Sequence, residues 1–225
     1  MIDFKGSHFE KEIIMWGVRW YIAYPISYRQ LEEMRGERGV RVDSSPLNRW
    51  GIKYAPEGET QFRRCPRPVG RSWRLEETSV KSKGQSAYLY RARDKDGHPM
   101  DFLLTPHRAR TAAETFLRKA IRPQGLPEKL PLDKSGANAA AITHDQKTQT
   151  VALIIRHCQY LNTRVEQDQR AVQRLTRPLL GFKSFWAARG TSAGIETMHA
   201  LRKGQLTSTE KALQTPAEQF YALAA

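Results

Sequence analysis

Cysteine and long apolar runs are both scarce in this chain, and each shortage excludes a class of protein. Only Cys65 and Cys158 occur among the 225 residues, in no C-x-x-C arrangement, which argues against a disulfide framework and against a zinc finger. The longest aliphatic run, "VALII" at 151–155, is far shorter than a membrane span, and the first residues lack the apolar segment of a signal peptide. We therefore expect a soluble, cytoplasmic protein without membrane contact.

Acidic residues are also few compared with basic ones. Lys and Arg number 37 against 23 Asp and Glu, which gives a formal net charge of +14 and a pI of about 10.0. This balance is typical of proteins that bind nucleic acids, although ribosomal, chromatin and membrane-surface proteins share it. The length fits one large domain, or a small module joined to a mid-sized domain that buries its own core.

The first part of the chain has the pattern of three short helices. Apolar residues recur at helical spacing over 9–24 and 28–39, and a third helix is expected from about residue 45, with Pro46 in its first turn. Gly39 ends the second helix and supplies a turn before the third. This arrangement indicates a helix-turn-helix, with a small helical bundle of another kind as the alternative. We assign residues 1–56 to this domain and expect it to bind DNA by itself.

Residues 57–72 are rich in Gly, Pro and Arg without periodicity, which is typical of a linker between domains. Three strand-like runs follow at 73–81, 86–93 and 100–105, separated by turn signals, and they predict an antiparallel meander. A helix with one apolar face is predicted over 109–121.

Beyond this helix the pattern continues in alternating elements. A poorer strand ends at Asp133, a short buried strand covers 151–155, and a long helical region starts near residue 161. The order βββαβαβα predicts a mixed α/β domain.

Several carboxylates fall where a sheet could bring them together. Phosphoryl transfer on DNA with two divalent ions needs carboxylates that converge, because Mg²⁺ takes hard oxygen ligands. Glu76 or Glu77 lies in the first strand, Asp133 ends the fourth, and Glu166 lies in the later helical region. Alternation puts Glu76 and Glu77 on opposite faces of their strand, but both faces of this sheet can be covered, so periodicity does not choose between them.

Glu166 shares a helix face with two other polar residues. Glu166, Arg170 and Gln173 are spaced i, i+4 and i+7, so they could contact a metal ion and a phosphate backbone together. The alternative is an ordinary solvated helix face. The remaining carboxylates of this part are more typical of surface or turn positions: Glu77, Asp94, Asp96, Asp101 and Asp168.

Five stretches carry a resemblance to a known family. The chain contains, in order, "RWYIAYPISYRQLEEMRGERGVRVD", "WRLEET" with "AYLYRARD", "DKSGANAAAI", "YLNTRVEQDQR" and "RPLLGFKSFWAARGTSAGIETMHALRKGQ". Together, from about residue 4 to 205, they resemble the DDE transposases of bacterial insertion-sequence family six. The resemblance implies an N-terminal helix-turn-helix, a ribonuclease H-like core of the retroviral-integrase type over 73–205, and a divergent tail at 206–225.

The resemblance also implies an activity and its site. Glu76 takes the place of the first catalytic acid in a W-x-x-D-E-T frame, and Asp133 and Glu166 match the second and third, which together would hold two Mg²⁺ or Mn²⁺ ions. The implied partners are the terminal inverted repeats and target DNA, bound by a homodimer or higher oligomer on the bacterial nucleoid, with replicative transposition as the outcome. The implied DNA contacts are Ser45, Asn48, Arg49, Arg170, Gln173, Arg174 and Lys183.

Some positions depart from the family pattern. Glu76 stands where the family has aspartate, and the third acid is surrounded by Thr163, Gln169 and Gln173 in place of the usual residues. Pro131 in a strand, Pro46 and Asn48 at the start of the recognition helix and Gly51 within it are further departures. They favour a second hypothesis, a decayed transposase that only binds DNA. A ribonuclease H-like nuclease of another purpose would explain neither the N-terminal module nor "LGFKSF".

Overall fold

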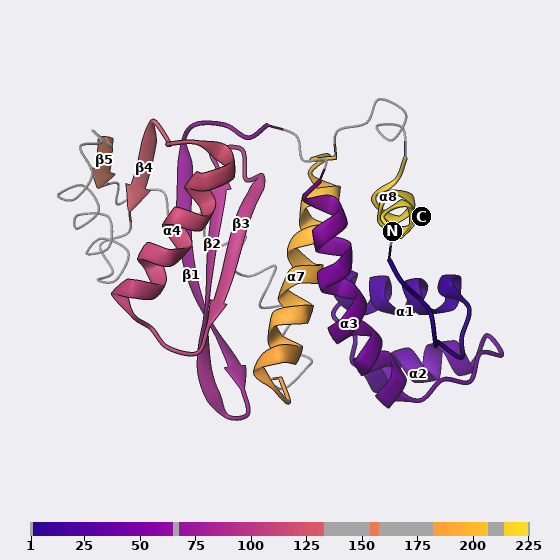
Figure 1. Ribbon diagram of the computed structural model, residues 1–225. Helices are drawn as coiled ribbons and strands as arrows, with labels where there is room; N and C mark the ends of the chain where they lie inside the picture. Colours follow the sequence, from indigo (N-terminus) through magenta and orange to yellow (C-terminus); the bar gives the residue numbers. More distant parts are fainter. Residues whose placement is uncertain (1, 65–67, 133–153, 158–181, 207–213, 225) are drawn as a thin grey trace. The chain divides into compact units, whose positions relative to one another are not determined.

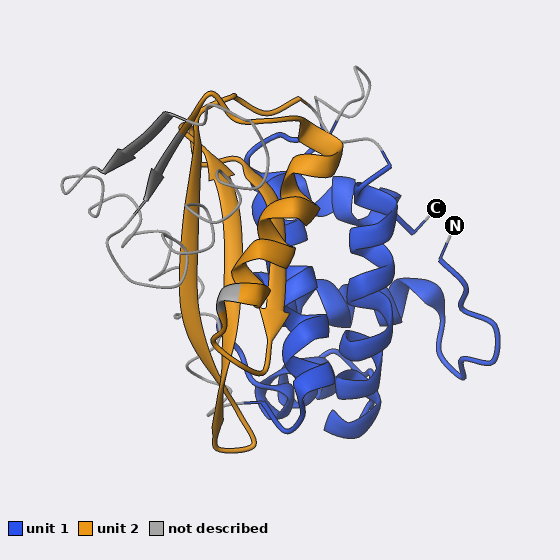
Figure 2. Cartoon of the chain, turned by 60° about the vertical axis from the view of Figure 1, so that its left-hand side comes forward, with its two compact units in different colours: residues 1–67, 171–225 blue, residues 68–170 orange. Residues whose placement is uncertain are grey.

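The computed structural model describes residues 2–64, 68–132, 154–157, 182–206 and 214–224 (Figure 1). The chain forms two compact units, which we call unit 1 (residues 1–67 and 171–225) and unit 2 (residues 68–170) (Figure 2). Within the described ranges, no helix combines the length and the apolar character needed to cross a membrane.

Unit 1 is made of helices. They are α1 (Lys11–Ala23), α2 (Tyr28–Gly36), α3 (Ser44–Phe62), α7 (Phe185–Arg202) and α8 (Pro216–Ala222) (Figure 1). α2 begins with a capping box, in which the Ser27 hydroxyl accepts from the Gln30 N–H and the Gln30 side chain accepts from the Ser27 N–H. The three helices predicted near the N-terminus are therefore present, but α3 continues through residues that the sequence pattern assigned to the linker at 57–72.

Close packing between α3 and α7 explains why α3 extends so far. A Cβ atom on Gly190 would lie 3.2 Å from both the Cα and the carbonyl oxygen of Ile52, and one on Gly194 would lie 3.1 Å from the Ala55 Cβ. The two helices approach this closely because α7 presents glycines to α3. Residues 1–56 therefore make up only part of the folded unit.

Gly51 has a packing role in the same region. A Cβ atom there would lie 2.6 Å from the hydroxyl oxygen of Tyr28, whose ring stacks on that of Tyr21 with centroids 3.8 Å apart. A glycine at this position therefore lets the Tyr28 hydroxyl lie against α3, which gives Gly51 a structural explanation.

The C-terminal segment completes unit 1. α8 contacts α1 and α7, and Phe220 is 1% exposed with its ring 3.9 Å from the position of a Cβ on Gly58. Thr215 and Glu218 form a capping box at its start. The tail that diverges from the family pattern is thus part of the helical core.

Unit 2 is built on an antiparallel sheet. β1 (Trp73–Ser82), β2 (Gln85–Asp94) and β3 (Pro99–Thr105) pair in the order β1-β2-β3, and α4 (Arg110–Gln124) follows. The turn between β1 and β2 is Lys83-Gly84, both with positive φ, as a two-residue hairpin requires. The apolar core lies between α4 and one face of the sheet, where Tyr90 and Phe116 are buried.

Two further short strands complete the described part of unit 2. β4 (Lys129–Leu132) and β5 (Ile154–His157) form a parallel pair, with Pro131 opposite Arg156. The mixed α/β class and the βββαβ order predicted from the sequence are confirmed.

Candidate active site and DNA-binding surface

Glu76 lies in the middle of β1 with its carboxylate against two arginines of β2. Its direct partner in the antiparallel register is Arg91, and paired residues project from the same face of a sheet. The Glu76 Oε2 atom lies 2.6 Å from Arg91 Nη2 and 3.7 Å from Arg93 Nε. Glu76 is 3% exposed and Arg91 is fully buried. We call these three residues the β1–β2 ion cluster.

Glu77 belongs to the opposite face, the one that α4 covers. Its register partner is Tyr90, and its Oε1 atom lies 2.7 Å from Arg108 Nε. Burial raises the pKa of the Tyr90 hydroxyl to about 12, and the negative charge of Glu77 adds to this effect. The two adjacent glutamates therefore have separate surroundings, and Glu77 pairs with Arg108 beside Tyr90.

β4 runs alongside the first strand in the same direction. An isolated parallel bridge joins Ser72 to Lys129, and β4 ends at Leu132, one residue before Asp133 in the chain. Of the three predicted acids the structure describes only Glu76. Five other predicted site residues lie outside the described ranges: Asp133, Glu166, Arg170, Gln173 and Arg174. The departures at Thr163 and Gln169 lie outside them as well.

Of the three predicted acids, Glu76 is the one whose contacts show how well a divalent metal ion would fit. Carboxylate oxygens are the donors that Mg²⁺ prefers, so the residue types fit a magnesium site. The guanidinium groups of Arg91 and Arg93 already occupy one oxygen of the Glu76 carboxylate. A metal ion at this glutamate would compete with them for that oxygen.

A second group of possible ligands, Asp94, Asp96 and His98, lies in the turn between β2 and β3. Asp94 accepts hydrogen bonds from the backbone N–H groups of Gly70 at 3.0 Å and of Asp96 and His98 at 2.9 Å, and its Oδ2 lies 2.9 Å from His98 Nδ1. Burial alone would raise the pKa of Asp94, but the hydrogen bonds from Gly70 and His98 outweigh it, and the pKa is lowered. The contacts explain Asp94 as the organiser of this turn.

The start of α3 presents polar side chains along one exposed line. Ser45, Arg49 and Lys53 are exposed and recur every fourth residue, with Asn48 half-buried beside them. We call Ser45, Arg49 and Lys53 the α3 row. Lys53 was not among the predicted DNA contacts, although the same spacing in the sequence could have identified it.

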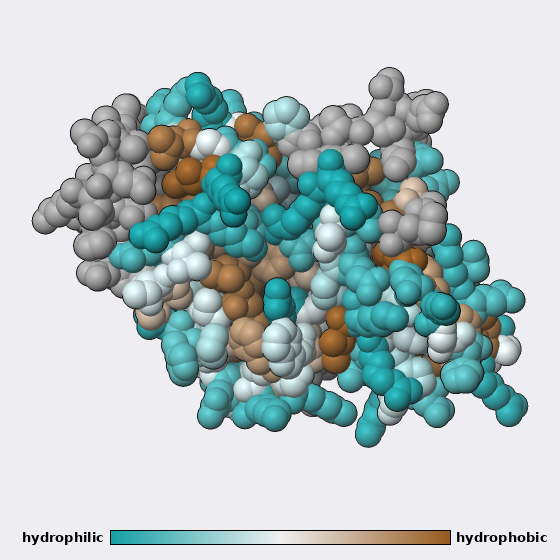
Figure 3. Space-filling model, viewed as in Figure 1, coloured by the Kyte–Doolittle hydropathy of each residue, from teal (hydrophilic) through white to brown (hydrophobic). Residues whose placement is uncertain are grey.

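Figure 3 shows hydrophilic side chains over much of the visible face, with smaller hydrophobic patches between them. Lys183, another predicted DNA contact, is exposed one residue before the Ser184 N-cap of α7.

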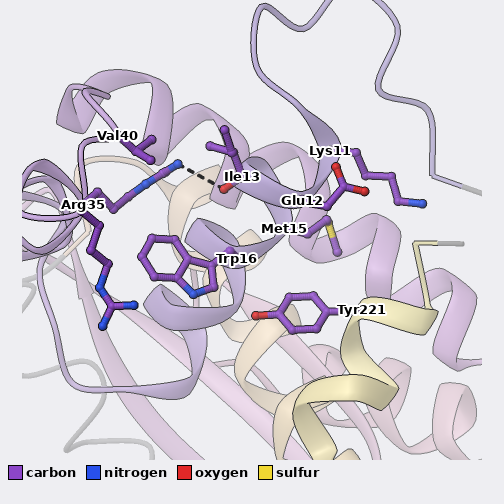
Figure 4. Close-up of a pocket in the computed structure, with 9 residues that line it drawn as sticks. Lys11, Glu12, Ile13, Met15, Trp16, Arg35, Val40 and Tyr221 are labelled. Atoms are coloured by element: carbon purple, nitrogen blue, oxygen red, sulfur yellow. Dashed lines mark hydrogen bonds between the residues drawn. The ribbon is translucent and has the colours of Figure 1, made fainter.

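Unit 1 also contains a pocket of about 660 Å³ (Figure 4). It lies between α1, the end of α2 and α8, and most of its lining is apolar. Arg35 on its wall is fully buried, and its Nη2 donates to the carbonyl oxygen of Ile13 at 3.3 Å. The guanidinium carbon lies 5.4 Å from the ring centroid of Trp16 and 5.5 Å from that of Trp50. Burial lowers the pKa of Arg35, and the two aromatic faces stabilise its charge.

Comparisons with known proteins assign the mixed α/β domain of unit 2 to a family. Residues 70–205 match the DDE domain family of IS240-type transposases. The transposase for insertion sequence-like element IS431mec of Staphylococcus aureus is 34% identical over 203 residues, which cover 89% of this chain and 88% of the relative. The transposase for insertion sequence element IS257 in transposon Tn4003, also of Staphylococcus aureus, shows the same identity and coverage.

One solved structure is also similar. The simian T-cell lymphotropic virus intasome in complex with PP2A regulatory subunit B56 gamma aligns with 70% of this chain and 58% of its own, at 17% identity and a TM-score of 0.45.

The sequence relatives and the matched domain establish the family. The chain belongs to the DDE transposases of insertion-sequence family six. Membership gives the coarse enzyme class, a polynucleotidyl transferase.

Proposed function

We propose that this transposase binds the terminal inverted repeats of its insertion sequence through α3, and nicks and joins DNA in replicative transposition. The observation that carries the proposal is the α3 row, which places two cations and a hydroxyl on one exposed helix face. An α-helix fits the major groove of DNA, where its first turns read base edges. A homodimer or higher oligomer would hold the two element ends.

The two cations of the α3 row and the neighbouring Asn48 have roles that their chemistry supports. Arg49 is suited to guanine, because its guanidinium can donate two hydrogen bonds to one base edge. Lys53, one turn further along, is suited to the phosphate backbone. Asn48 at the edge of the row can pair with adenine in the same way.

Binding of an inverted-repeat duplex by the full chain tests these roles. Arg49→Ala should weaken binding by about 1–3 kcal/mol and relax the sequence preference, whereas Lys53→Ala should lower the slope of affinity against salt by about one. Lys95→Ala is the matched control, because it removes an exposed lysine from the β2–β3 turn of unit 2. Equal losses in all three variants would show that only net charge matters and would reject α3 as the recognition helix.

For the chemistry, we propose that Glu76, Asp133 and Glu166 hold two Mg²⁺ ions. Such ions activate a water molecule and stabilise the leaving oxygen at a phosphodiester. The parallel course of β4 beside β1 supports the assignment, because the described strand ends at Leu132 immediately before Asp133. The chain itself would have to release Glu76 from Arg91 and Arg93.

The β1–β2 ion cluster supports a second candidate function. A carboxylate buried against two guanidinium groups is stabilised as an ion pair, and moving it towards a metal costs its contacts with Arg91 and Arg93. In this case the chain would bind inverted repeats without cutting them.

Nicking of a labelled inverted-repeat substrate with Mg²⁺ separates the two candidates. Glu76→Asp should raise nicking by up to about 10²-fold, because the shorter side chain restores the ligand reach of the family's aspartate. Glu77→Gln should change little, and Glu166→Gln serves as the inactive control. If the parent and all variants are equally inactive, the DNA-binding function alone is supported. If only Glu77→Gln abolishes cleavage, the first acid is Glu77.

A further inference from the structure

Trp186 in the first turn of α7 is exposed to an unusual degree. It is 64% exposed, compared with 45% for Leu126 and 42% for Tyr24, the other large apolar side chains exposed in the described part of the chain. A large exposed aromatic side chain is informative because its burial elsewhere would be strongly favourable. The packing of the described part of unit 1 therefore leaves most of this ring available to a partner.

The indole ring is also held in place on the helix. Arg189, one turn further along α7, lies with its guanidinium carbon 5.6 Å from the ring centroid of Trp186. The ring of Phe185 meets it edge-on, with centroids 6.3 Å apart and an interplanar angle of 78°. These contacts orient the ring before any partner binds, so less entropy is lost when it stacks on another ring.

The charges around Trp186 favour an anionic partner. Lys183 and Arg189 are both exposed, and the sequence from 182 to 195 contains no acidic residue. The first turn of α7 also carries the positive end of the helix dipole. An exposed aromatic ring among cations is the combination by which proteins bind single-stranded nucleic acid, with the ring against a base and the cations against phosphates.

We propose that Trp186 stacks on an unpaired base of DNA, while Lys183 and Arg189 neutralise the neighbouring phosphates. This inference rests on the proposed function in that DNA is the partner. An unpaired base is required because a duplex exposes only base edges in its grooves, whereas an indole stacks on the flat face of a base. The site would therefore act where the duplex opens or ends, separately from duplex recognition by the α3 row.

The experiment compares two probes on the full chain. One is a short single-stranded oligonucleotide that carries 2-aminopurine, whose fluorescence is quenched by stacking, and the other is the inverted-repeat duplex. Trp186→Ala should reduce affinity for the single strand about tenfold and abolish the quenching, while the affinity for the duplex changes less than about twofold. Trp186→Phe should restore most of the affinity, because an aromatic face remains. Leu126→Ala is the control for loss of an exposed apolar side chain and should have no effect.

Three results would overturn the proposal. The first is unchanged single-strand affinity in Trp186→Ala, and the second is an equal loss for single strand and duplex, which points to a general effect on fold or charge. The third is a change in sedimentation of Trp186→Ala without a change in DNA affinity, which assigns the ring to a protein interface. If the parent binds the duplex but not the single strand, this inference fails and the proposed function stands. If it binds neither, both fail.

Discussion

The carboxylate of Glu76 is the group on which the stability of the sheet in unit 2 and the proposed chemistry both depend. Glu76→Gln keeps the shape of the side chain but removes the negative charge that faces Arg91 and Arg93. We expect a loss of about 3–5 kcal/mol in the free energy of unfolding, as is typical when one partner of a buried ion pair is removed. Urea unfolding of the full chain measures this loss.

Glu77→Gln is the matched control, since Arg108, its partner, is half exposed. It should reduce the free energy of unfolding by about 1 kcal/mol, as expected for a pair that water screens. Equal effects of the two variants would contradict the structural role assigned to Glu76. A stable Glu76→Gln variant that has lost only its metal response would assign Glu76 wholly to the chemistry.

The raised pKa of the Tyr90 hydroxyl can be measured in solution. Its pKa is raised to about 12, first by burial and then by the charge of Glu77. A raised folded-state pKa contributes stability that is fully present below the unfolded value of about 10 and is lost as the pH rises through about 12. Ultraviolet titration should therefore show one phenol that ionises about two pH units above the ordinary value of about 10, and this phenol should be missing from Tyr90→Phe. Ionisation of every tyrosine near pH 10 would contradict the burial of Tyr90.

At the scale of elements, the strands of unit 2 and the register of their first hairpin could be predicted from the sequence. The strands of unit 2 and α4 were predictable because their apolar residues alternate or recur at helical spacing. The two-residue turn at Lys83-Gly84 also determines the register, and counting outward from it pairs Glu76 with Arg91. The main contact of Glu76 could therefore have been found from the sequence.

The length of α3 could not be predicted in this way. Gly51, Pro56 and Gly58 all disfavour a helix interior, so local preference ends the helix early. The helix continues because α7 packs along it, and this contact joins segments that are far apart in the chain. The contribution of α8 to unit 1 escaped prediction for the same reason, since Phe220 has a partner only in the folded unit.

The packing of α7 on α3 leads to a prediction about Gly190. Gly190→Ala should lower the free energy of unfolding by about 1–3 kcal/mol, because the new methyl group meets the backbone of Ile52, which has little freedom to move. Gly36→Ala in α2 is the matched control, as nothing lies within 4 Å of its Cβ position, and it should be neutral or slightly stabilising. Thermal unfolding followed by circular dichroism at 222 nm measures both, and a neutral Gly190→Ala would refute the close approach.

At the scale of the whole molecule, unit 1 is built from two separate parts of the chain. A fragment of residues 1–64 lacks the α7 face that covers α3, so it should show weak helical signal and bind inverted repeats much more weakly than the full chain. A fusion of 1–64 to 182–224 through a flexible linker should recover both properties. Full DNA affinity in the short fragment would contradict the structural dependence of α3 on α7.

The discontinuity of unit 1 also has a consequence for protein synthesis. A ribosome releases α3 long before α7, since α3 ends at Phe62 and α7 begins at Phe185. Chains emerge from the N-terminus and fold as their contacts become available, so the helix proposed to read DNA acquires its packing partner only after unit 2 has been translated. Products of a premature stop or a frameshift in the intervening codons would therefore contain α3 without the helix that packs along it.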